Sequence, residues 1–395
     1  MKTIFDKVTD RRGSSAIKTD WLKEYYGRED LIPLWIADMD FQTPDFIVSA
    51  LKKRMEHPIF GYFRPDESYW HSIIAWEKRI HNWDVKREEL SFMPGIVRGI
   101  AYAIQCFTNP GDGIVVQPPV YMPFIHLPEQ NGRKLLYNPL KYICGQYEMD
   151  FNQLADLCER EKPKMLILSN PHNPAGRVWS VETLRKLADI CSKYNVIVIS
   201  DEIHAAMALF GNIHVPFAAA SETAQKISIT FAAPSKTFNI AGIISSFVVV
   251  KDEEIRKKFY NYLEANEFNA PMMTSVIATQ AAYTDAGDKW RIKMLKYVEE
   301  NVRYVTDFLG VNVPQISVVR PQASFLVWLN CKMLGLSHDA LIDLFVNKAH
   351  LALNDGEAFG PGGEGYMRMN VGCPRQILET AMQQLKEAVE KLHEN

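Results

Sequence analysis

The sequence lacks the closely spaced cysteines from which zinc sites and redox motifs are built. Six cysteines are scattered singly along its 395 residues, and no pair has the spacing of a Cys-x-x-Cys site. We therefore predict no metal site and interpret the cysteines as ordinary reduced thiols of the core. They are Cys106, Cys144, Cys158, Cys191, Cys331 and Cys373.

An excess of charge of one sign is also missing. The chain has 44 Lys and Arg residues and 47 Asp and Glu residues, so its net charge is only -3. No long run of one sign occurs. Surfaces that bind nucleic acids or membranes usually need such an excess, so we expect neither partner and favour a small, soluble substrate.

Long hydrophobic runs are the third absence. No segment approaches the roughly 20 apolar residues of a membrane-spanning helix. The first residues, "MKTIFDKVTDRRGSS", carry charges where a signal peptide would have its apolar region. The sequence therefore predicts a cytoplasmic protein.

The middle of the chain alternates short apolar runs with helical patterns, which is typical of a parallel sheet covered by helices. The segment "SVETLRKLADICSKY", with Ser180 as its expected N-cap, is predicted to be a crossover helix between two of the strands. The apolar runs are "GIVVQPP", "KMLILSN", "VIVISDE", "ISITFAA" and "SSFVVV". We predict an α/β fold whose large domain, residues 50–285, contains a mostly parallel central sheet.

The pattern changes after about residue 285. A long charged helix, "KWRIKMLKYVEENVRYVTDFLG", is followed by the strand "SFLVWLN" and the closing helix "PRQILETAMQQLKEAVEKL". We predict a smaller α+β domain here, made of residues 1–49 and 286–395.

Polar side chains follow several of the predicted strands. Asn170 and Asn173 follow "MLIL", Asp201 follows "VIVIS", and Lys236 follows "ISITFAA". Ligands of open α/β sheets bind beyond the carboxyl ends of the strands, so these residues are expected to share one site. Desolvation would lower the pKa of Lys236 and prepare its amine to form a Schiff base. The alternative is a lysine whose stem lies on apolar surface while its amine reaches water.

Asp201 ends a buried strand, so its carboxylate needs a partner. A protonated pyridine nitrogen is a suitable one, as in pyridoxal phosphate sites, although a strand-end Asp also serves as a simple turn former. Asn173 lies in "SNPHNPAGRVWS", which is a tight turn in any case. Its side chain would also be a preset donor to the phenolate oxygen of the cofactor ring.

The turn in "FMPGIVRGIAYAIQCF" is a candidate phosphate site. It opens a helix whose first N–H groups have no intrahelical partner, although many such turns bind nothing. We predict that the backbone of Gly95, Ile96 and Val97 donates to a phosphate, with Ser235 as a second donor. Tyr121, in "QPPVYMPF", is placed to stack on a pyridine ring or to pack on the neighbouring prolines.

Taken in order, the phosphate turn, "PPVYMPF", "NPHNPAG", "SDEIH" and "SKTFNIAG" resemble the fold type I, aspartate-aminotransferase-like pyridoxal phosphate enzymes over essentially the whole chain. Within that superfamily, the segments "PLWIADMDF", "SDEIHA" and "GYMRMNVGCPR", with the pair Gly61 and Tyr62, resemble the C-S lyase branch, which includes cystathionine β-lyases.

This resemblance implies pyridoxal 5'-phosphate as the cofactor and assigns further roles. Lys236 would form the internal aldimine, Asp201 would pair with the pyridinium, and Asn173 and His204 would meet the ring phenolate. Tyr121 would stack on the ring and, like Asn173, contact the substrate. It also implies two more contacts: Tyr62 would reach the phosphate of the neighbouring subunit, which predicts a homodimer with shared sites, and Arg368 would bind the substrate carboxylate.

One position departs from the aminotransferase pattern. Those enzymes often carry an arginine eight residues beyond the lysine, where this chain has Ile244. Phosphate binding would then depend more on backbone N–H groups and hydroxyls.

The expected reaction is β-elimination from cystathionine or another cysteine S-conjugate, which yields a thiol, pyruvate and ammonia. Lys236 would remove the Cα proton, and Lys236 or Tyr121 would assist the leaving sulfur. An aminotransferase uses the same residues and is the nearest alternative. A regulatory protein that retains the fold is a third.

Overall fold

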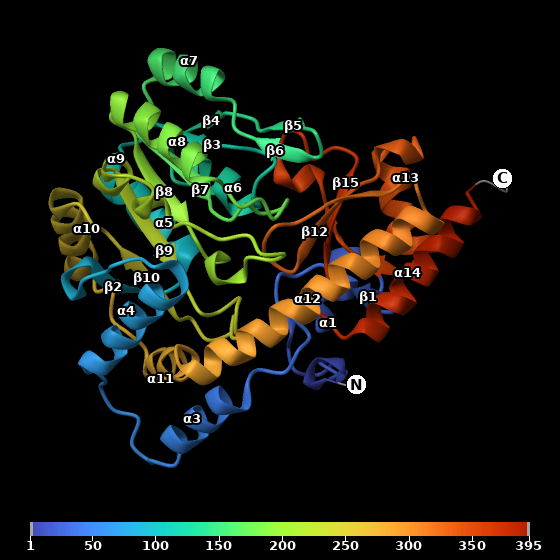
Figure 1. Cartoon of the computed structure of the whole chain (residues 1–395), viewed down its shortest axis with the longest axis horizontal. Helices are drawn as coiled ribbons and strands as arrows, with labels where there is room; N and C mark the ends of the chain where they lie inside the picture. Colours follow the sequence, from blue (N-terminus) through green and yellow to red (C-terminus); the bar gives the residue numbers. More distant parts are fainter. Residues whose placement is uncertain (1–2, 393–395) are drawn as a thin grey trace.

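A computed structural model describes residues 3–392, and its largest element is a seven-stranded sheet (Figure 1). The strand order is β2-β10-β9-β8-β7-β3-β4. β10 is antiparallel to both of its neighbours, whereas the other pairs are parallel. The mostly parallel sheet predicted from the sequence is therefore confirmed. Its strands are β2 (Leu90–Met93), β3 (Gly113–Val116), β4 (Lys134–Tyr137), β7 (Met165–Ser169), β8 (Ile197–Asp201), β9 (Ser228–Ala232) and β10 (Ser246–Val249).

Helices cover both faces of this sheet, which explains why its strands are continuous apolar runs rather than alternating ones. In β7, Met165 and Ile167 pack in the cluster that contains α5 and α10. Leu166 and Leu168, which point the opposite way, pack in the cluster that contains α7 and α8. The helices around the sheet are α5 (Ile96–Phe107), α6 (Met122–Gln130), α7 (Phe151–Glu161), α8 (Val181–Lys193), α9 (Glu222–Lys226) and α10 (Glu253–Ala265).

The parallel direction brings distant segments to one edge of the sheet. β10 reverses the direction twice, so β2 runs the same way as β9, β8, β7 and β3. The carboxyl ends of these five strands therefore meet. The predicted crossover helix is α8, and Ser180 caps it by accepting a hydrogen bond from the backbone N–H of Thr183.

A second group of strands and helices is formed by the N-terminal and C-terminal segments of the chain. A four-stranded sheet has the order β11-β12-β15-β14, and β1 pairs in parallel with β13. Figure 1 shows the long helix α12 running beside α14. The elements are β1 (Ile32–Pro33), β11 (Ser317–Val319), β12 (Leu326–Asn330), β13 (Leu351–Ala352), β14 (Asn354–Asp355), β15 (Tyr366–Asn370), α12 (Asp285–Asn312), α13 (His338–Asp343) and α14 (Arg375–Glu390).

The β1–β13 pair joins the N-terminal segment to the C-terminal region. The division into domains at residues 50–285 and at 1–49 with 286–395 stays a prediction. Residues 1–2 and 393–395 of the proposed small domain lie outside the described residues. The remaining helices before α5 and after α10 are α1 (Ile17–Asp20), α2 (Leu22–Tyr26), α3 (Asp45–Met55), α4 (Glu67–His81) and α11 (Met273–Ala282).

One prediction about the cysteines is wrong. All six are free, but Cys144 is exposed rather than a core thiol. It lies in the tight turn between β5 (Lys141–Ile143) and β6 (Gln146–Glu148), with a positive φ of 49°. A two-stranded hairpin has no core of its own in which to bury its turn. Within residues 3–392, no helix combines the length and the apolar character needed to cross a membrane.

Candidate active site

The carboxyl ends of the central strands surround a cavity of about 120 Å³. It is lined by Ala37, Ile96, Val97, Tyr121, Ser169, Pro171, Asn173, Asp201, Ile203, His204 and Lys236. The structure thus brings together most of the residues that the sequence analysis selected, although they come from segments far apart in the chain.

Lys236 lies in the turn that follows β9, with its amine directed into this cavity. The side chain is partly buried, and its Nζ donates a hydrogen bond to the carbonyl of Ala37 at 2.6 Å. Desolvation lowers the pKa of Lys236 to about 8, while the nearby charges of Asp38 and Asp201 oppose the shift and that of Arg368 adds to it. This geometry disfavours the alternative in which the amine reaches bulk water.

Asp201 is the last residue of β8, and its carboxylate is buried at the cavity wall. Oδ1 accepts a hydrogen bond from the backbone N–H of Ile203 at 3.0 Å, so the residue does act as a local turn former. Among the described residues it has no ion-pair partner. Burial therefore raises the pKa of Asp201 to about 7, although the Ile203 bond and the charge of Lys236 oppose the shift. A buried carboxylate in this state is suited to a cationic ligand group.

Arg368, from β15, lies against Asn173, which lines the cavity. Its Nη1 donates to the side-chain oxygen of Asn173 at 3.1 Å, and its Nη2 donates to Asn354 at 2.6 Å and to the carbonyl of Trp35 at 3.2 Å. Nε is buried without a partner. Desolvation lowers the pKa of Arg368 to about 10. A buried guanidinium whose hydrogen-bond partners are all neutral is suited to a carboxylate ligand.

Two rings complete the walls around these charges. His204 is buried, its Nδ1 has no partner, and desolvation lowers its pKa to about 3, so the imidazole stays neutral. Tyr121 precedes α6, and burial raises the pKa of its phenol. A neutral imidazole and a phenol can both donate a hydrogen bond to a ligand oxygen.

The predicted phosphate turn opens α5 at the edge of the cavity. Gly95 has φ = 106°, a conformation that glycine adopts without strain, and it precedes the helix without any side-chain cap. Ile96 and Val97 line the cavity, so the unpaired N–H groups of this helix end lie beside it. Ile244 lies next to Gly95, since a Cβ added there would be 3.9 Å from its Cγ2. The isoleucine that departs from the aminotransferase pattern is therefore adjacent to this turn.

Four predicted residues are not among those that line the cavity: Gly95 and Arg368, described above, and Ser235 and Tyr62. Ser235 is buried beside Lys236. Tyr62 is fully exposed, in the extended segment 56–66 between α3 and α4. Ile59 and Phe60 of the same segment are 66% and 61% exposed. Within one chain, Tyr62 thus belongs to a projecting apolar surface rather than to the cavity.

Sequence reasoning missed several residues of the site. Ala37 and Asp38 reach Lys236 from the loop after β1, and Trp35 and Asn354 hold Arg368. The only sequence signal was the likeness of "PLWIADMDF" to one branch of a superfamily, because neither alanine nor a lone aspartate in a loop suggests chemistry by itself. Among residues 3–392, no group of three or more His, Cys, Asp or Glu side chains could hold a metal ion.

Comparison with known proteins gives a consistent result. Residues 29–385 match the model of the family "Aminotransferase class I and II". The chain is 42% identical to cystathionine beta-lyase PatB of Bacillus subtilis over 385 residues, which cover 98% of this chain and 99% of that protein.

Solved structures show the same likeness. Cystalysin from Treponema denticola, whose structure contains a pyridoxal 5'-phosphate cofactor, superposes with a TM-score of 0.94 at 32% identity and covers 99% of this chain and 100% of its own. The PLP-bound C-S lyase from Staphylococcus hominis superposes with a TM-score of 0.91 at 32% identity and covers 98% of both chains.

Proposed function

This chain belongs to the aminotransferase class I and II family, and from that premise we propose that it is a pyridoxal-phosphate-dependent C-S β-lyase. Its substrates are cystathionine or related cysteine S-conjugates, and its products are a thiol, pyruvate and ammonia. The observation that carries this proposal is the 42% identity to a cystathionine beta-lyase along the whole chain.

The cavity fits pyridoxal 5'-phosphate at each of its chemical groups. Asp201 is a buried carboxylate without a cation and would pair with the pyridine nitrogen. The uncapped start of α5 would hold the phosphate. His204, with an unpartnered Nδ1, and Asn173 would face the ring oxygen, and Tyr121 would lie against the ring.

The cofactor, when bound, supplies an electron sink that stabilises negative charge at the substrate Cα. Arg368 would hold the substrate carboxylate and so orient the Cα–H bond toward Lys236. With a pKa near 8, Lys236 can be neutral at physiological pH and accept that proton. Lys236 or Tyr121 would then give a proton to the departing sulfur, and the released enamine hydrolyses to pyruvate and ammonia.

An aminotransferase would use the same residues but would return the proton to a carbon of the cofactor instead of expelling the β-substituent. The products therefore decide between the two reactions. We expect sustained pyruvate release from L-cystathionine by the cofactor-loaded protein without any added keto acid. Pyruvate formation coupled to lactate dehydrogenase measures it. A single turnover that continues only after a keto acid is added would instead establish transamination and overturn the lyase proposal.

The exposed segment around Tyr62 supports a homodimer. Ile59, Phe60 and Tyr62 project from the chain at the end of α3, and Val48, Leu51 and Met55 form an apolar surface on that helix. A second copy that covers this segment would bury apolar area and bring Tyr62 to the phosphate turn of its neighbour. We propose that each active site takes Tyr62 from the other subunit.

Subunit complementation tests this arrangement. Tyr62→Ala should lower affinity for pyridoxal 5'-phosphate by roughly tenfold, since one hydrogen bond to a charged group is lost. Co-expressed with Lys236→Ala, it should give mixed dimers in which one site has both native residues and is active.

If Tyr62 acts within its own chain, or if the protein is a monomer, the mixture at limiting pyridoxal 5'-phosphate is no more active than the sum of Lys236→Ala and Tyr62→Ala measured separately. Tyr142→Ala is the matched control, because Tyr142 is also exposed but lies on the β5–β6 hairpin. It should leave cofactor affinity unchanged.

A further inference from the structure

The loop that reaches Lys236 is held in place from several sides. This active-site loop, residues 34–41, has the sequence "LWIADMDF" and runs from β1 toward α3. The carbonyl of Ala37 accepts the hydrogen bond from Lys236 Nζ at 2.6 Å. Because this acceptor is a backbone atom, its position depends on how the neighbouring residues of the loop are fixed.

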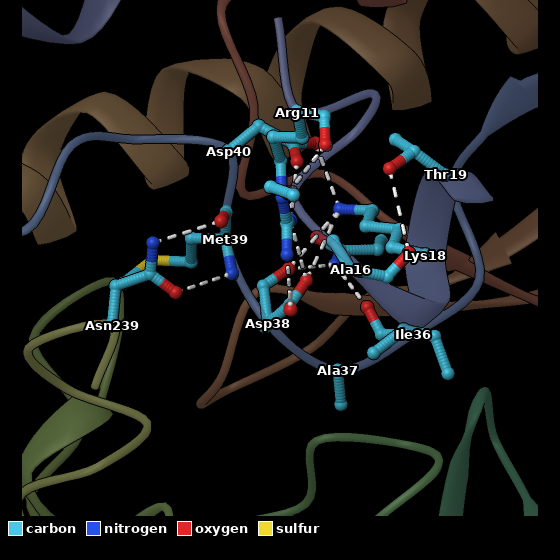
Figure 2. Close-up of polar contacts among 12 residues, drawn as sticks. Arg11, Ala16, Lys18, Thr19, Ile36, Ala37, Asp38, Met39, Asp40 and Asn239 are labelled. Carbon is cyan, nitrogen blue, oxygen red and sulfur yellow. Dashed lines mark hydrogen bonds and ion pairs between the residues drawn. The ribbon is translucent and has the colours of Figure 1, made fainter. Parts of the chain in front are cut away.

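Four charged side chains, two of them from the loop itself, form one cluster (Figure 2). The guanidinium of Arg11 binds both oxygens of Asp38, at 2.9 and 2.7 Å, and also binds Asp40 at 2.9 Å. Lys18 Nζ donates to Asp40 at 2.7 Å and to the backbone carbonyl of Asp38 at 3.1 Å. We call Arg11, Lys18, Asp38 and Asp40 the N-terminal clamp, because both cations come from the segment before β1.

Lys18 is the least expected member of this clamp. Its side chain is 0% exposed, although an ammonium loses much hydration energy when it is buried. The backbone on which it sits is also fixed, because the indole N–H of Trp35 donates to the Lys18 carbonyl at 3.0 Å. A buried ion pair contributes little to stability by comparison with well-packed apolar residues of similar volume.

Two asparagines hold the same loop from its other sides. Asn239 accepts a hydrogen bond from the N–H of Met39 at 2.9 Å and donates to the carbonyls of Met39 and Phe41 at 2.8 and 2.7 Å. It lies three residues after Lys236 in the same turn, so one turn carries both the amine and an anchor of its acceptor. Asn370 donates to the carbonyls of Ile36 and Asp38 at 2.6 Å each. The residues on both sides of Ala37 are therefore fixed.

We propose that Arg11 and Lys18 are positioning residues for Lys236: through Asp38 and Asp40 they hold the Ala37 carbonyl where it accepts a hydrogen bond from the free amine. This inference rests on the proposed function of Lys236 as the reacting amine. It gives the N-terminal segment, which contributes no side chain to the cavity wall, a defined part in the chemistry.

Loss of the hydrogen bond to the Ala37 carbonyl should change the protonation of Lys236. An acceptor stabilises the ammonium, so its loss should lower the pKa of Lys236 and leave the side chain free to turn away. Other charges also act on this amine, namely Asp38, Asp201 and Arg368, and neutral His204 lies beside it. A test must therefore remove the clamp without changing the net charge near Lys236.

The double variant Lys18→Met with Asp40→Asn meets that condition. Asn239→Gly also keeps the charge and removes a different anchor of the same loop. Glycine tolerates the positive φ of 54° at residue 239. We would mix each cofactor-free variant with pyridoxal 5'-phosphate at pH values below and above 8 and trap the covalent product with borohydride. Peptide mapping then measures attachment at Lys236. The limiting rate of attachment should fall about tenfold through misplacement, and its pH midpoint should move down by about one unit. In the loaded enzyme, kcat should fall more than KM changes.

The matched control is Lys23→Met with Glu29→Gln. It removes another ion pair of the N-terminal region, but one whose side chains are 75% and 74% exposed, and it should behave as wild type. Attachment rates within about twofold of wild type with an unchanged midpoint, in folded clamp variants, would overturn the proposal. If the double variant does not fold, Arg11→Lys, which keeps the charge but loses the two-pronged contact with Asp38, decides by the same measurements. If covalent attachment of pyridoxal 5'-phosphate persists in Lys236→Ala, the proposed function is overturned instead.

Discussion

Replacing Lys236 by alanine is expected to abolish both covalent attachment of pyridoxal 5'-phosphate and pyruvate release, by roughly 10⁴-fold or more in turnover. The variant loses the amine that would bond to the cofactor and accept the substrate proton. It should still bind the cofactor non-covalently, since Asp201 and the start of α5 remain. Borohydride trapping followed by peptide mapping measures attachment, and the pyruvate assay measures turnover.

The wild-type protein adds a pH signature to this result. Because desolvation lowers the pKa of Lys236 to about 8, the reactive neutral amine accumulates as the pH rises through that value, and attachment should accelerate accordingly. Lys226→Ala removes an exposed lysine just before β9 and should leave rate and profile intact. A Lys236→Ala protein that turned over at the wild-type rate would refute the assignment of this lysine.

Replacing Asp201 by asparagine is the second change with a large expected effect. Asparagine keeps the shape and the hydrogen bond from Ile203, but it has no charge with which to keep the pyridine nitrogen protonated. We expect kcat to fall by roughly 10² to 10⁴, with a smaller change in KM, because the lost interaction matters most as negative charge develops. Asp201→Glu should retain more activity than Asp201→Asn.

Stability should respond in the opposite direction when no cofactor is present. The folded-state pKa of Asp201 is raised from 3.8 to about 7, so its ionisation destabilises the cofactor-free fold progressively between those values and fully above them. Asp201→Asn should therefore have a higher Tm than wild type above pH 7, and this advantage should vanish below about pH 4.

Addition of pyridoxal 5'-phosphate should reverse that order, since the cofactor supplies the missing cation only to the native carboxylate. Asp189→Asn, on the exposed face of α8, is the control and should change neither Tm nor its pH dependence. An Asp201→Asn variant that was as active as wild type, and whose Tm without cofactor was no higher, would show that Asp201 does not face the pyridine nitrogen.

Local sequence patterns predicted much of the fold and part of the site. Five apolar runs predicted five strands of the central sheet, because a strand buried on both faces must be continuously apolar. The ends of β7, β8 and β9 then followed, and with them the positions of Asn173, Asp201 and Lys236 at one edge. The exposure of Cys144 could not be predicted in the same way, since a single cysteine carries no signal about the hairpin that contains it.

The resemblance to a superfamily extended this reading to residues that no pattern selects, such as His204 and Arg368. The structure places His204 in the cavity and Arg368 against Asn173. Tyr62 shows the limit of one chain, because its place in a shared site depends on a second subunit. Its projection from segment 56–66 supports that proposal, and the complementation experiment tests it.

The sequence by itself determined the class of fold, the strand ends that carry chemistry, and the family to which the chain belongs, because each of these is written in contiguous residues. Only the tertiary structure decided how the amine of Lys236 is held. Its acceptor, Ala37, is 199 residues away in the chain, and the ions that fix that acceptor come from still another segment. Such a contact has no local pattern, since it arises from the packing of the N-terminal segment against the turn after β9.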